Sequence, residues 1–397
     1  MKIGILHYTS WPVIGGVETV IRQHALLLSR HGHEVSVFSG EGAAFSKQVP
    51  SIIFRELNTR DPRVKTAQQE AFSGHPGRAY FQLIERLQSL LAPLFAKFER
   101  LIVHNLFTMQ FNMAATQALT TFADQGKKLI AWTHDLAANN SDYQIPVQQP
   151  FDLIRECHPN VKYVTISEAR AAEFNKLTGS HVTAVIPNAL DFFDACGITP
   201  EVAKLVGDEP ADSILLFYPT RVVPRKNIAF ALQIAAAMQA TGLRVRLLIS
   251  GASDPHNASS ATYFAGLKKL AGDLQIQNSV FWVNDLFYVD ERQLRSLYMV
   301  ADALLFPSKQ EGFGLPLLEA AAYRLPIFCA NIEPLKSIAP SGTVLFDLRD
   351  APRNIADRIG RALAQDEILK NRKQLFRDYS AETLYFRKME PLLLDTL

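Results

Sequence analysis

Short runs of apolar residues alternate along this chain with longer stretches in which apolar residues recur every three or four positions. Most of the short runs are continuously apolar, which is typical of strands buried on both faces of a parallel sheet. The longer stretches predict helices that cover those faces. Strands and helices in alternation predict the α/β class, with doubly wound parallel sheets.

The expected strands fall into two groups, one in each half of the chain. The first group is Ile3–Tyr8, Glu34–Ser39, Leu101–Asn105, Lys128–Thr133, Tyr163–Ser167 and Thr183–Pro187. The second group is Ile214–Pro219, Arg244–Ser250, Val280–Val283, Ala303–Pro307, Pro326–Cys329 and Thr343–Phe346.

The chain has 397 residues, more than one hydrophobic core usually holds, so two domains are expected. The stretch with the weakest pattern near the middle is Asp191 to Ser213, which combines glycines and prolines with scattered charges. We therefore expect one domain at 1–195 and a second at 196–380. The apolar, helix-like segment 381–397 is expected to pack back on the first domain.

The stretch from Ser39 to Arg78 is rich in glycine, proline and charge and departs from this compact pattern. The helical pattern that follows, Tyr80–Phe98, gathers its apolar residues on one face. The favoured interpretation is a helix packed on its own sheet. The alternative is an amphipathic patch that touches a membrane or a lipid acceptor.

Composition narrows the class of protein. Apolar residues make up 48% of the chain and charged residues 20%, and the net charge is only +2, which does not favour a nucleic-acid partner. The cysteines Cys157, Cys196 and Cys329 lack CxxC spacing, so neither a disulfide framework nor a zinc site is expected and a cytoplasmic location fits best. The first apolar run is too short for a signal peptide, and no run reaches the roughly 18 residues of a membrane span. Peripheral contact with the inner face of a membrane stays open.

A candidate site lies where the strand pattern Ala301–Pro307 meets a helix pattern at Leu315–Tyr323. The loop between them contains Gly312 and Gly314, which let the backbone approach a ligand closely. The free N–H groups of a first helical turn and the helix dipole favour an anion such as a phosphate.

Two carboxylates, Glu311 and Glu319, frame this turn. Carboxylates accept hydrogen bonds from hydroxyl groups, of which sugars carry many. One such residue alone is usually a solvated charge, but the pair around a glycine turn favours a ligand with phosphate in the middle and hydroxyls at both ends. A nucleoside diphosphate sugar has that shape.

Cations follow another expected strand, Ile214–Pro219. Arg221 and Lys226 would lie at its carboxyl end, where ligands bind in open α/β sheets, and could neutralise a diphosphate leaving group. Taken alone, this spacing is usually a solvated turn, and Arg225 can point to solvent.

The first domain offers two further features. Gly15 and Gly16 precede a helix after the first strand, but they do not match the G-x-G-x-x-G pattern of dinucleotide sites. The strand pattern ending at Thr133 is followed by His134 and Asp135. A histidine there could bond a sugar hydroxyl or the leaving oxygen, although a lone histidine is usually structural.

These segments together resemble the GT-B glycosyltransferases, family GT4 in particular. The segment from Glu311 to Glu319 is similar to the family's E-x7-E signature. The likeness extends, in the family's order and over nearly the whole chain, to Gly15–Glu18, His134–Asp135, Ile186–Asp191, Arg221 with Lys226, and Leu294–Tyr298.

The resemblance implies two Rossmann-like domains that face a cleft. It assigns acceptor binding to 1–195 and nucleotide-sugar binding to 196–380. It also implies transfer of a hexose with retention of configuration, no metal and no cofactor. The co-substrate would be a nucleoside diphosphate sugar of the UDP-glucose or GDP-mannose type, and the acceptor a sugar, a small polar molecule or a glycolipid.

The resemblance also implies roles for single residues. The catalytic set would be His134, Arg221, Lys226 and Glu311. Arg221, Lys226 and Glu311 would also bind the donor, together with Gly15, Gly16, Asp285, Leu286, Gly312, Phe313, Gly314, Leu315 and Glu319. The acceptor set would be His104, Asn105 and Asp135.

Two positions depart from the family pattern, because Ala189 and Asn227 stand where glycine is frequent. The alternatives are a sugar-nucleotide epimerase or a phosphorylase-like enzyme on a similar fold, and a non-catalytic sugar-nucleotide-binding protein. Exposed cations of the 40–78 loop, namely Arg60, Arg63, Lys65 and Arg78, could bind an anionic acceptor, although such cations are more often solvated.

Overall fold

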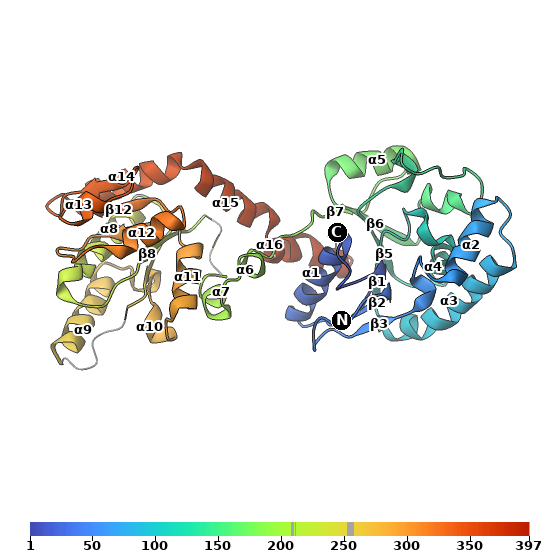
Figure 1. Ribbon diagram of the computed structural model, residues 1–397, viewed down its shortest axis with the longest axis horizontal. Helices are drawn as coiled ribbons and strands as arrows, with labels where there is room; N and C mark the ends of the chain where they lie inside the picture. The colour runs from blue at the N-terminus through green and yellow to red at the C-terminus, as the bar shows by residue number, and fades with distance from the viewer. Residues whose placement is uncertain (208–209, 211, 252–257, 397) are drawn as a thin grey trace. The chain divides into compact units, whose positions relative to one another are not determined.

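The computed structural model describes residues 1–207, 210, 212–251 and 258–396. The chain forms two compact units (Figure 1). Unit 1 comprises Met1–Leu190 and Tyr379–Leu397, and unit 2 comprises Asp191–Asp378. The chain therefore leaves unit 1 and returns to it, and at this point Leu190 donates a backbone hydrogen bond to the carbonyl of Tyr379 at 2.9 Å.

Unit 1 is built on a seven-stranded parallel sheet in the order β3-β2-β1-β4-β5-β6-β7. Its strands are β1 Lys2–Thr9, β2 Glu34–Glu41, β3 Ser51–Ile53, β4 Arg100–His104, β5 Leu129–Thr133, β6 Val161–Thr165 and β7 Ala184–Val185. The central strands are buried along their length, as expected for a sheet that is covered on both faces.

Helices cover both faces of this sheet. They are α1 Gly16–Arg30, α2 Pro62–Phe72, α3 Arg78–Lys97, α4 Met113–Asp124 and α5 Glu168–Thr178. Alternate residues of β1 point to opposite faces, so Ile3 and Ile5 share a core with α1, while Leu6 and Tyr8 share a core with α2, α3 and α4.

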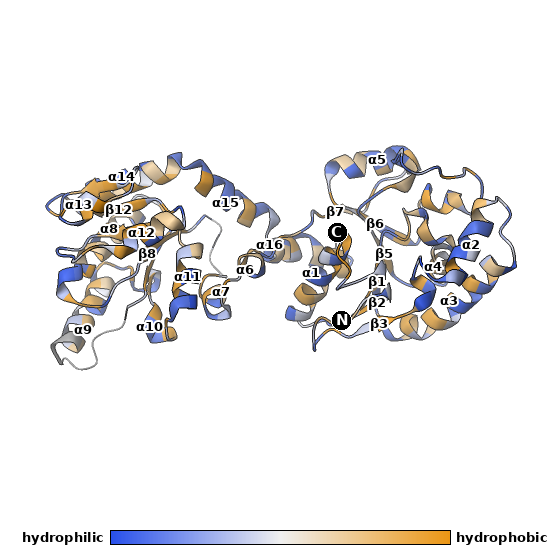
Figure 2. Ribbon diagram, in the orientation of Figure 1, coloured by the Kyte–Doolittle hydropathy of each residue, from blue (hydrophilic) through white to orange (hydrophobic). Residues whose placement is uncertain are grey.

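The apolar face of α3 is used inside unit 1. Tyr80, Leu83, Leu87 and Phe95 on this face are all buried, and Figure 2 shows hydrophobic and hydrophilic residues together on the helix. The favoured interpretation, a helix packed on its own sheet, is therefore confirmed. The alternative, an amphipathic patch that touches a membrane or a lipid acceptor, stays a prediction, although most of the apolar residues on this face are buried in the core of unit 1.

The terminal segment belongs to unit 1 and consists of α16 Ala381–Leu384, the π-helix η7 Tyr385–Met389 and α17 Glu390–Leu393. It packs on the α1 face of the sheet. His31 Nε2 lies 2.7 Å from a carboxylate oxygen of Glu382, and the two rings of His31 and Tyr385 stack at 3.8 Å.

Unit 2 contains a six-stranded parallel sheet in the order β10-β9-β8-β11-β12-β13. Its strands are β8 Ile214–Tyr218, β9 Val245–Ile249, β10 Val280–Trp282, β11 Ala303–Phe306, β12 Ile327–Ala330 and β13 Val344–Phe346. The fold class expected from the sequence, with two doubly wound Rossmann-like domains as in GT-B proteins, is confirmed for each unit.

The helices of unit 2 pack around one continuous hydrophobic core. They are α6 Phe192–Ala195, α7 Pro200–Val206, α8 Ile228–Gln239, α9 Ala258–Asp273, α10 Val283–Leu286, α11 Glu291–Val300, α12 Leu315–Ala322, α13 Leu335–Ile338, α14 Pro352–Gln365 and α15 Glu367–Tyr379.

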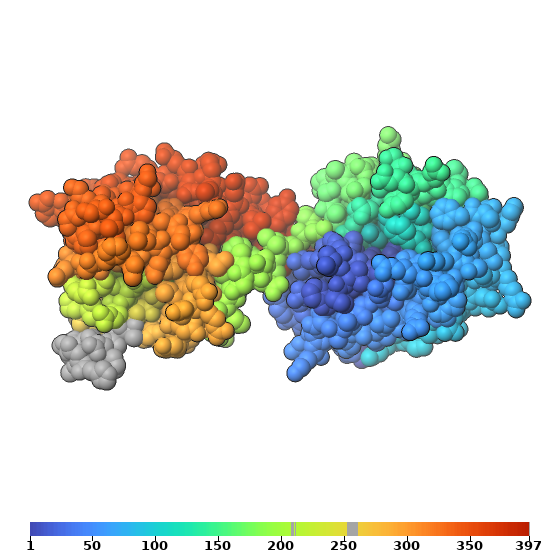
Figure 3. All heavy atoms as spheres, viewed as in Figure 1, coloured from blue at the N-terminus to red at the C-terminus, as the bar shows by residue number. Residues whose placement is uncertain are grey.

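Two local features differ from the expectation. The stretch 39–78 is packed, because it contains β3, a 3-10 turn at Arg55–Leu57 and α2, and Figure 3 shows the N-terminal segments in blue on one face of unit 1. The expected connection 191–213 contains α6 and α7, while its residues 208, 209 and 211 lie outside the described part. The three cysteines are free. Across the described ranges, no helix combines the length and the apolar character that crossing a membrane requires.

Candidate functional site

The predicted donor residues follow the two central strands of unit 2. β8 and β11 are neighbours in the sheet, although the chain passes through β9 and β10 between them. Such a reversal of strand order leaves a crevice outside the carboxyl ends of the two strands, where open α/β sheets bind ligands. The loop after β8 carries Arg221 and Lys226, and the loop after β11 carries Glu311 to Gly314.

Hydrogen bonds fix these two loops to each other. The Tyr218 hydroxyl contacts the carbonyl of Lys226 and lies 2.8 Å from Ser308 Oγ. Asn227 Nδ2 donates to the carbonyl of Pro307 at 3.1 Å. Asn227 is in the left-handed region at φ 54°, which asparagine tolerates better than most residues. The asparagine that departs from the family pattern therefore preserves the turn and adds a bond across the loops.

An ion pair lies where the loops meet. Lys226 Nζ is 2.5 Å from Glu311 Oε1, and the two side chains are only 12% and 7% exposed. An ammonium group has three donors, so Lys226 can keep this bond and still donate to a phosphate. Arg225 is more distant from the same carboxylate, at 3.9 Å, and more exposed. The structure thus brings the predicted Lys226 and Glu311 together.

The glycine turn leads directly into α12. Gly314 is the residue before the helix and has a φ of 104°, and a Cβ there would lie 2.5 Å from Leu335 Cδ2. Gly312 has open space around it, while Phe313 and Leu315 are exposed. The strand, the glycine turn and the helix expected from the sequence are therefore present. The first turn of α12 follows the loop that carries Glu311.

The second carboxylate, Glu319, is oriented by a tyrosine. The hydroxyl of Tyr298 donates to Glu319 Oε2 at 2.6 Å. Tyr298 lies on α11, is buried, and stacks on Tyr323 with 5.2 Å between ring centroids. Burial, followed by the bond to Glu319, raises the pKa of Tyr298, so the phenol stays protonated and remains a donor.

The Arg221 loop is held by a close backbone approach. Arg221 is exposed, and within the described part of the chain its guanidinium has neither a hydrogen bond nor an ion pair. Gly251, directly after β9, is so close to this loop that a Cβ would lie 1.7 Å from the carbonyl oxygen of Thr220. Only glycine leaves room for the loop as it stands.

Two further residues expected to bind the donor lie at the edge of the sheet. The strand expected at Val280–Val283 ends at Trp282, and Asp285 and Leu286 belong to the short helix α10. Asp285 pairs with Lys268 Nζ at 2.7 Å, and Leu286 is 59% exposed.

Unit 1 has the same kind of strand reversal between β1 and β4. Gly15 and Gly16 begin α1 after β1. Gly15 is extended, and nothing lies within 4 Å of a Cβ built on Gly16. The Glu18 carboxylate folds back to accept a hydrogen bond from the Thr9 hydroxyl.

His134 follows β5 and is firmly held. Its backbone N–H donates to Asn105 Oδ1 at 2.8 Å, and its Nε2 lies 2.9 Å from His104 Nδ1. Asn105 reaches it from a left-handed turn at φ 60°. Burial, with smaller contributions from His24 and His7, lowers the pKa of His134 to about 3. His134 is therefore neutral at physiological pH, and its imidazole has one N–H donor and one accepting nitrogen.

Of the predicted acceptor residues, two are buried and one is exposed. His104 is fully buried, so the expectation that it contacts an acceptor directly does not hold in this structure. Asn105 is 7% exposed, and its side-chain oxygen already receives the N–H groups of His134 and Asp135. The Asp135 side chain is 57% exposed, with Arg170 3.8 Å away, and can reach a ligand.

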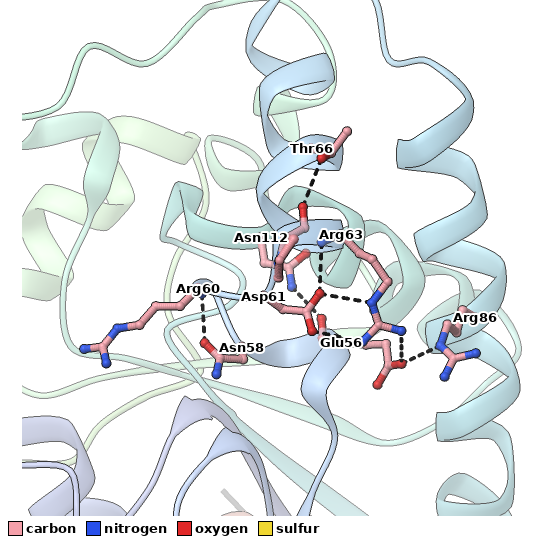
Figure 4. Close-up of polar contacts among 9 residues, drawn as sticks. Glu56, Asn58, Arg60, Asp61, Arg63, Thr66, Arg86 and Asn112 are labelled. Atoms are coloured by element: carbon pink, nitrogen blue, oxygen red, sulfur yellow. Dashed lines mark hydrogen bonds and ion pairs between the residues drawn. The ribbon is translucent and has the colours of Figure 1, made fainter.

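Of the four loop cations that could bind an anionic acceptor, Arg60 and Arg63 form ion pairs within unit 1, while Lys65 and Arg78 are exposed; Figure 4 shows the contacts around Arg63. Arg63 binds both Asp61, at 2.9 Å, and Glu56, at 3.1 Å. Arg86 contacts the same buried Glu56 carboxylate. Arg60 lies 3.6 Å from Glu41. These pairs hold the 55–63 turn in place, which favours the structural interpretation of the cluster.

Four supporting residues were given no role from the sequence, namely Tyr218, Gly251, Tyr298 and Ser308, although Tyr298 ends the family-like segment Leu294–Tyr298. Only Gly251 had a local signal, since a Ser-Gly pair follows an apolar strand. The other three act through contacts between distant segments. Over the same described ranges, His, Cys, Asp and Glu side chains form no cluster that could hold a metal ion.

Comparison with known families agrees with this geometry. Residues 14–192 match the family model "Glycosyltransferase Family 4", and residues 204–378 match "Glycosyl transferases group 1". This chain belongs to the family 4, group 1 glycosyltransferases. The two matches correspond closely to the two units and include the loops described above.

Relatives of this glycosyltransferase include two that match over most of its length. The mannosylglucosylglycerate synthase of Petrotoga mobilis is 23% identical over 413 residues, covering 95% of this chain and 93% of the relative. The synthase of the same name from Thermotoga maritima is 24% identical, covering 88% and 85%. A sucrose-phosphate synthase from Thermosynechococcus elongatus, of known structure, is 18% identical with a TM-score of 0.41, covering 99% of this chain and 98% of that one.

Proposed function

We propose that this glycosyltransferase moves a hexose from a nucleoside diphosphate sugar to a hydroxyl group of its acceptor. The observation that carries the proposal is the Lys226–Glu311 pair at the strand reversal of unit 2. Lys226 provides a cation that can bind a diphosphate, and Glu311 provides a carboxylate that can accept hydrogen bonds from sugar hydroxyls. Both lie at the carboxyl end of the sheet, where ligands bind in open α/β folds.

We propose the remaining donor contacts at the carboxyl ends of the strands of the same sheet. Arg221, whose guanidinium has no partner among the described residues, joins Lys226 in binding the diphosphate, and the backbone from Gly312 to Leu315 offers N–H groups at the start of α12. Glu319, oriented by Tyr298, receives the ribose hydroxyls. Asp285 and Leu286 bind the base.

Unit 1 contributes to the proposal through His134, Asp135, Gly15 and Gly16. The neutral imidazole of His134 forms a hydrogen bond with the transferred sugar. The glycines at the start of α1 allow close approach to a phosphate. Asp135 is the exposed group suited to bind an acceptor hydroxyl.

The reaction we propose retains the anomeric configuration and needs neither a metal nor a cofactor. The bond between the anomeric carbon and the leaving phosphate oxygen breaks, and the acceptor oxygen bonds to the same face of that carbon. The acceptor proton passes to the leaving phosphate. Arg221 and Lys226 stabilise the charge that develops there, as fixed donors do in other transfer reactions.

Mannose is the first sugar to test, ahead of glucose. The two relatives that match over most of the chain are named for a mannosyl product, and several shorter matches are named mannosyltransferases. The first acceptor to test is glucosylglycerate, because the names of the same two relatives contain it.

The test is a donor screen of the full chain, with GDP-mannose and UDP-glucose each offered together with the acceptor. Products are identified by mass spectrometry, and the anomeric proton of the new linkage is read by NMR. We expect one donor to give a glycoside of retained configuration in the presence of EDTA. Inversion or a requirement for metal would contradict the mechanism, and interconversion of the donor without transfer would indicate an epimerase.

A further inference from the structure

His134 belongs to a buried cluster of four aromatic side chains. The rings of His104 and His134 stack with 5.2 Å between centroids, and His104 lies 6.0 Å from Trp132. His24 lies 5.6 Å from His104 and 4.6 Å from Trp132. His104, Trp132 and His24 are at most 2% exposed, while His134 is 4% exposed at the carboxyl end of β5.

The three histidines of this cluster are neutral at physiological pH. Burial lowers the pKa of His24 to about 4 and that of His134 to about 3, and it holds the pKa of His104 well below its usual range. A neutral imidazole has one N–H donor and one bare nitrogen that accepts. Each ring therefore has two possible tautomers, and its neighbours decide between them.

The hydrogen bond between His104 Nδ1 and His134 Nε2, at 2.9 Å, links the two tautomers. If His134 donates, His104 must have its proton on Nε2. That nitrogen is buried without a partner, so the result is an isolated N–H. If His104 donates instead, its Nε2 is a bare acceptor, and His134 has its proton on Nδ1.

The second arrangement is favoured by its surroundings. Isolated buried N–H groups are rarer in proteins than acceptors that lack a partner. The cluster already contains one such donor, because the Trp132 indole Nε1 can only donate and is also buried without a partner. A bare nitrogen on His104 avoids placing a second isolated N–H group in this cluster.

We propose that His104 is a positioning residue that holds His134 as the tautomer with its proton on Nδ1. His134 then presents an N–H to a ligand, since no residue of the described structure bonds its Nδ1. It donates to an oxygen of the sugar or acceptor and cannot remove a proton through that nitrogen. The effect on catalysis rests on the proposed function, while the tautomer itself does not.

The test is long-range 1H–15N NMR of the full chain labelled at histidine, near neutral pH, which reports which ring nitrogen is protonated. His134 is assigned from the signals that disappear in His134→Asn. We expect protonation at Nδ1 in the wild-type protein. Protonation at Nε2, or a positively charged ring, would overturn the proposal without the need for any further variant.

His104→Phe removes the partner of His134 while keeping a buried aromatic ring. We expect His134 to lose the Nδ1–H signal as its dominant form. The matched control is His24→Phe, which makes the same change in the same cluster but leaves the bond to His134 intact. It should keep the wild-type tautomer. An unchanged His134 in His104→Phe would also overturn the proposal.

Turnover of the same samples separates this inference from the proposed function. If His104→Phe lowers kcat while His24→Phe does not, the tautomer matters for transfer. If the Nδ1–H tautomer is found but His134→Asn transfers sugar at the wild-type rate, the positioning role stands and the catalytic role of His134 fails.

Discussion

The carboxylate of Glu319 shows how a residue named by a motif depends on one that is not. Its position in the E-x7-E segment could be read from the sequence, but its orientation comes from Tyr298, which lies 21 residues earlier on α11. No local pattern distinguishes Tyr298 from a tyrosine that is simply buried. Its hydrogen bond to Glu319 forms only because α11 and α12 lie close together in the fold. Asn227 is the converse case, since its left-handed backbone replaces the expected glycine without loss of the turn.

Tyr298→Phe should weaken donor binding. It removes a hydrogen bond to a charged group, which contributes about 1.5–3 kcal/mol, and so we expect the KM for the donor to rise about tenfold or more with little change in kcat. Steady-state kinetics with varied donor measures this. Tyr323→Phe is the control, because Tyr323 stacks on Tyr298 and no hydrogen bond of its hydroxyl is found in the described structure. Equal effects of the two variants would show that Tyr298 acts through packing alone.

At the scale of elements, the site is made of loops that follow neighbouring strands. The strands of both sheets could be predicted because they are buried on both faces and read as continuous apolar runs. β3 was missed because it is a three-residue edge strand in a stretch rich in glycine and proline. α6 and α7 were missed because such short helices have too few turns to show a period.

Because Gly251 lies so close to the Arg221 loop, a side chain at this position should disturb the loop. In Gly251→Ala the new Cβ meets backbone atoms, so we expect the loop to shift, the free energy of unfolding to fall by about 1–3 kcal/mol, and donor turnover to drop. Gly266→Ala on α9 is the control, because nothing lies within 4 Å of a Cβ there; turnover should be retained, and stability should be retained or rise slightly because alanine favours a helix. Circular dichroism melting and turnover measure the two effects. Wild-type stability and turnover in Gly251→Ala would show that the close approach is not required.

At the scale of the whole molecule, the two-domain class and the two parallel sheets could be predicted, since they depend on the order of strand and helix patterns. The ion pairs that hold the C-terminal segment on unit 1 could not be predicted, because they join charges from segments that are distant in the sequence. Asp395, near the end of the chain, contacts Arg100, Lys128 and Lys162 at 2.6, 2.8 and 2.9 Å. Lys128 first, and then Lys162, lower the pKa of this carboxyl to about 2.

Asp395→Asn should destabilise unit 1 in a pH-dependent way. The folded pKa lies below the unfolded value, so the stabilisation is fully present above the unfolded pKa near 3.9 and is lost as pH falls through the folded pKa. The carboxylate is 38% exposed and screened by water, so we expect only about 1 kcal/mol at neutral pH, or about 2–4 °C in Tm. The difference in Tm between the variant and the wild-type protein should shrink as the pH falls from 5 to 3. Asp357→Asn, which alters one exposed helical pair, is the control. A Tm difference that is constant across this range would contradict the ionic account.

The central claim is that the loops after β8 and β11 bind the donor diphosphate, and Lys226→Ala tests it most directly. Losing one fixed donor to a developing charge lowers turnover by about 100-fold or more, so we expect that loss in kcat with the preferred donor and acceptor. Lys370→Ala removes an exposed cation on α15, outside both loops, and should keep wild-type turnover. Wild-type turnover in a folded Lys226→Ala variant would contradict the assignment of the donor site.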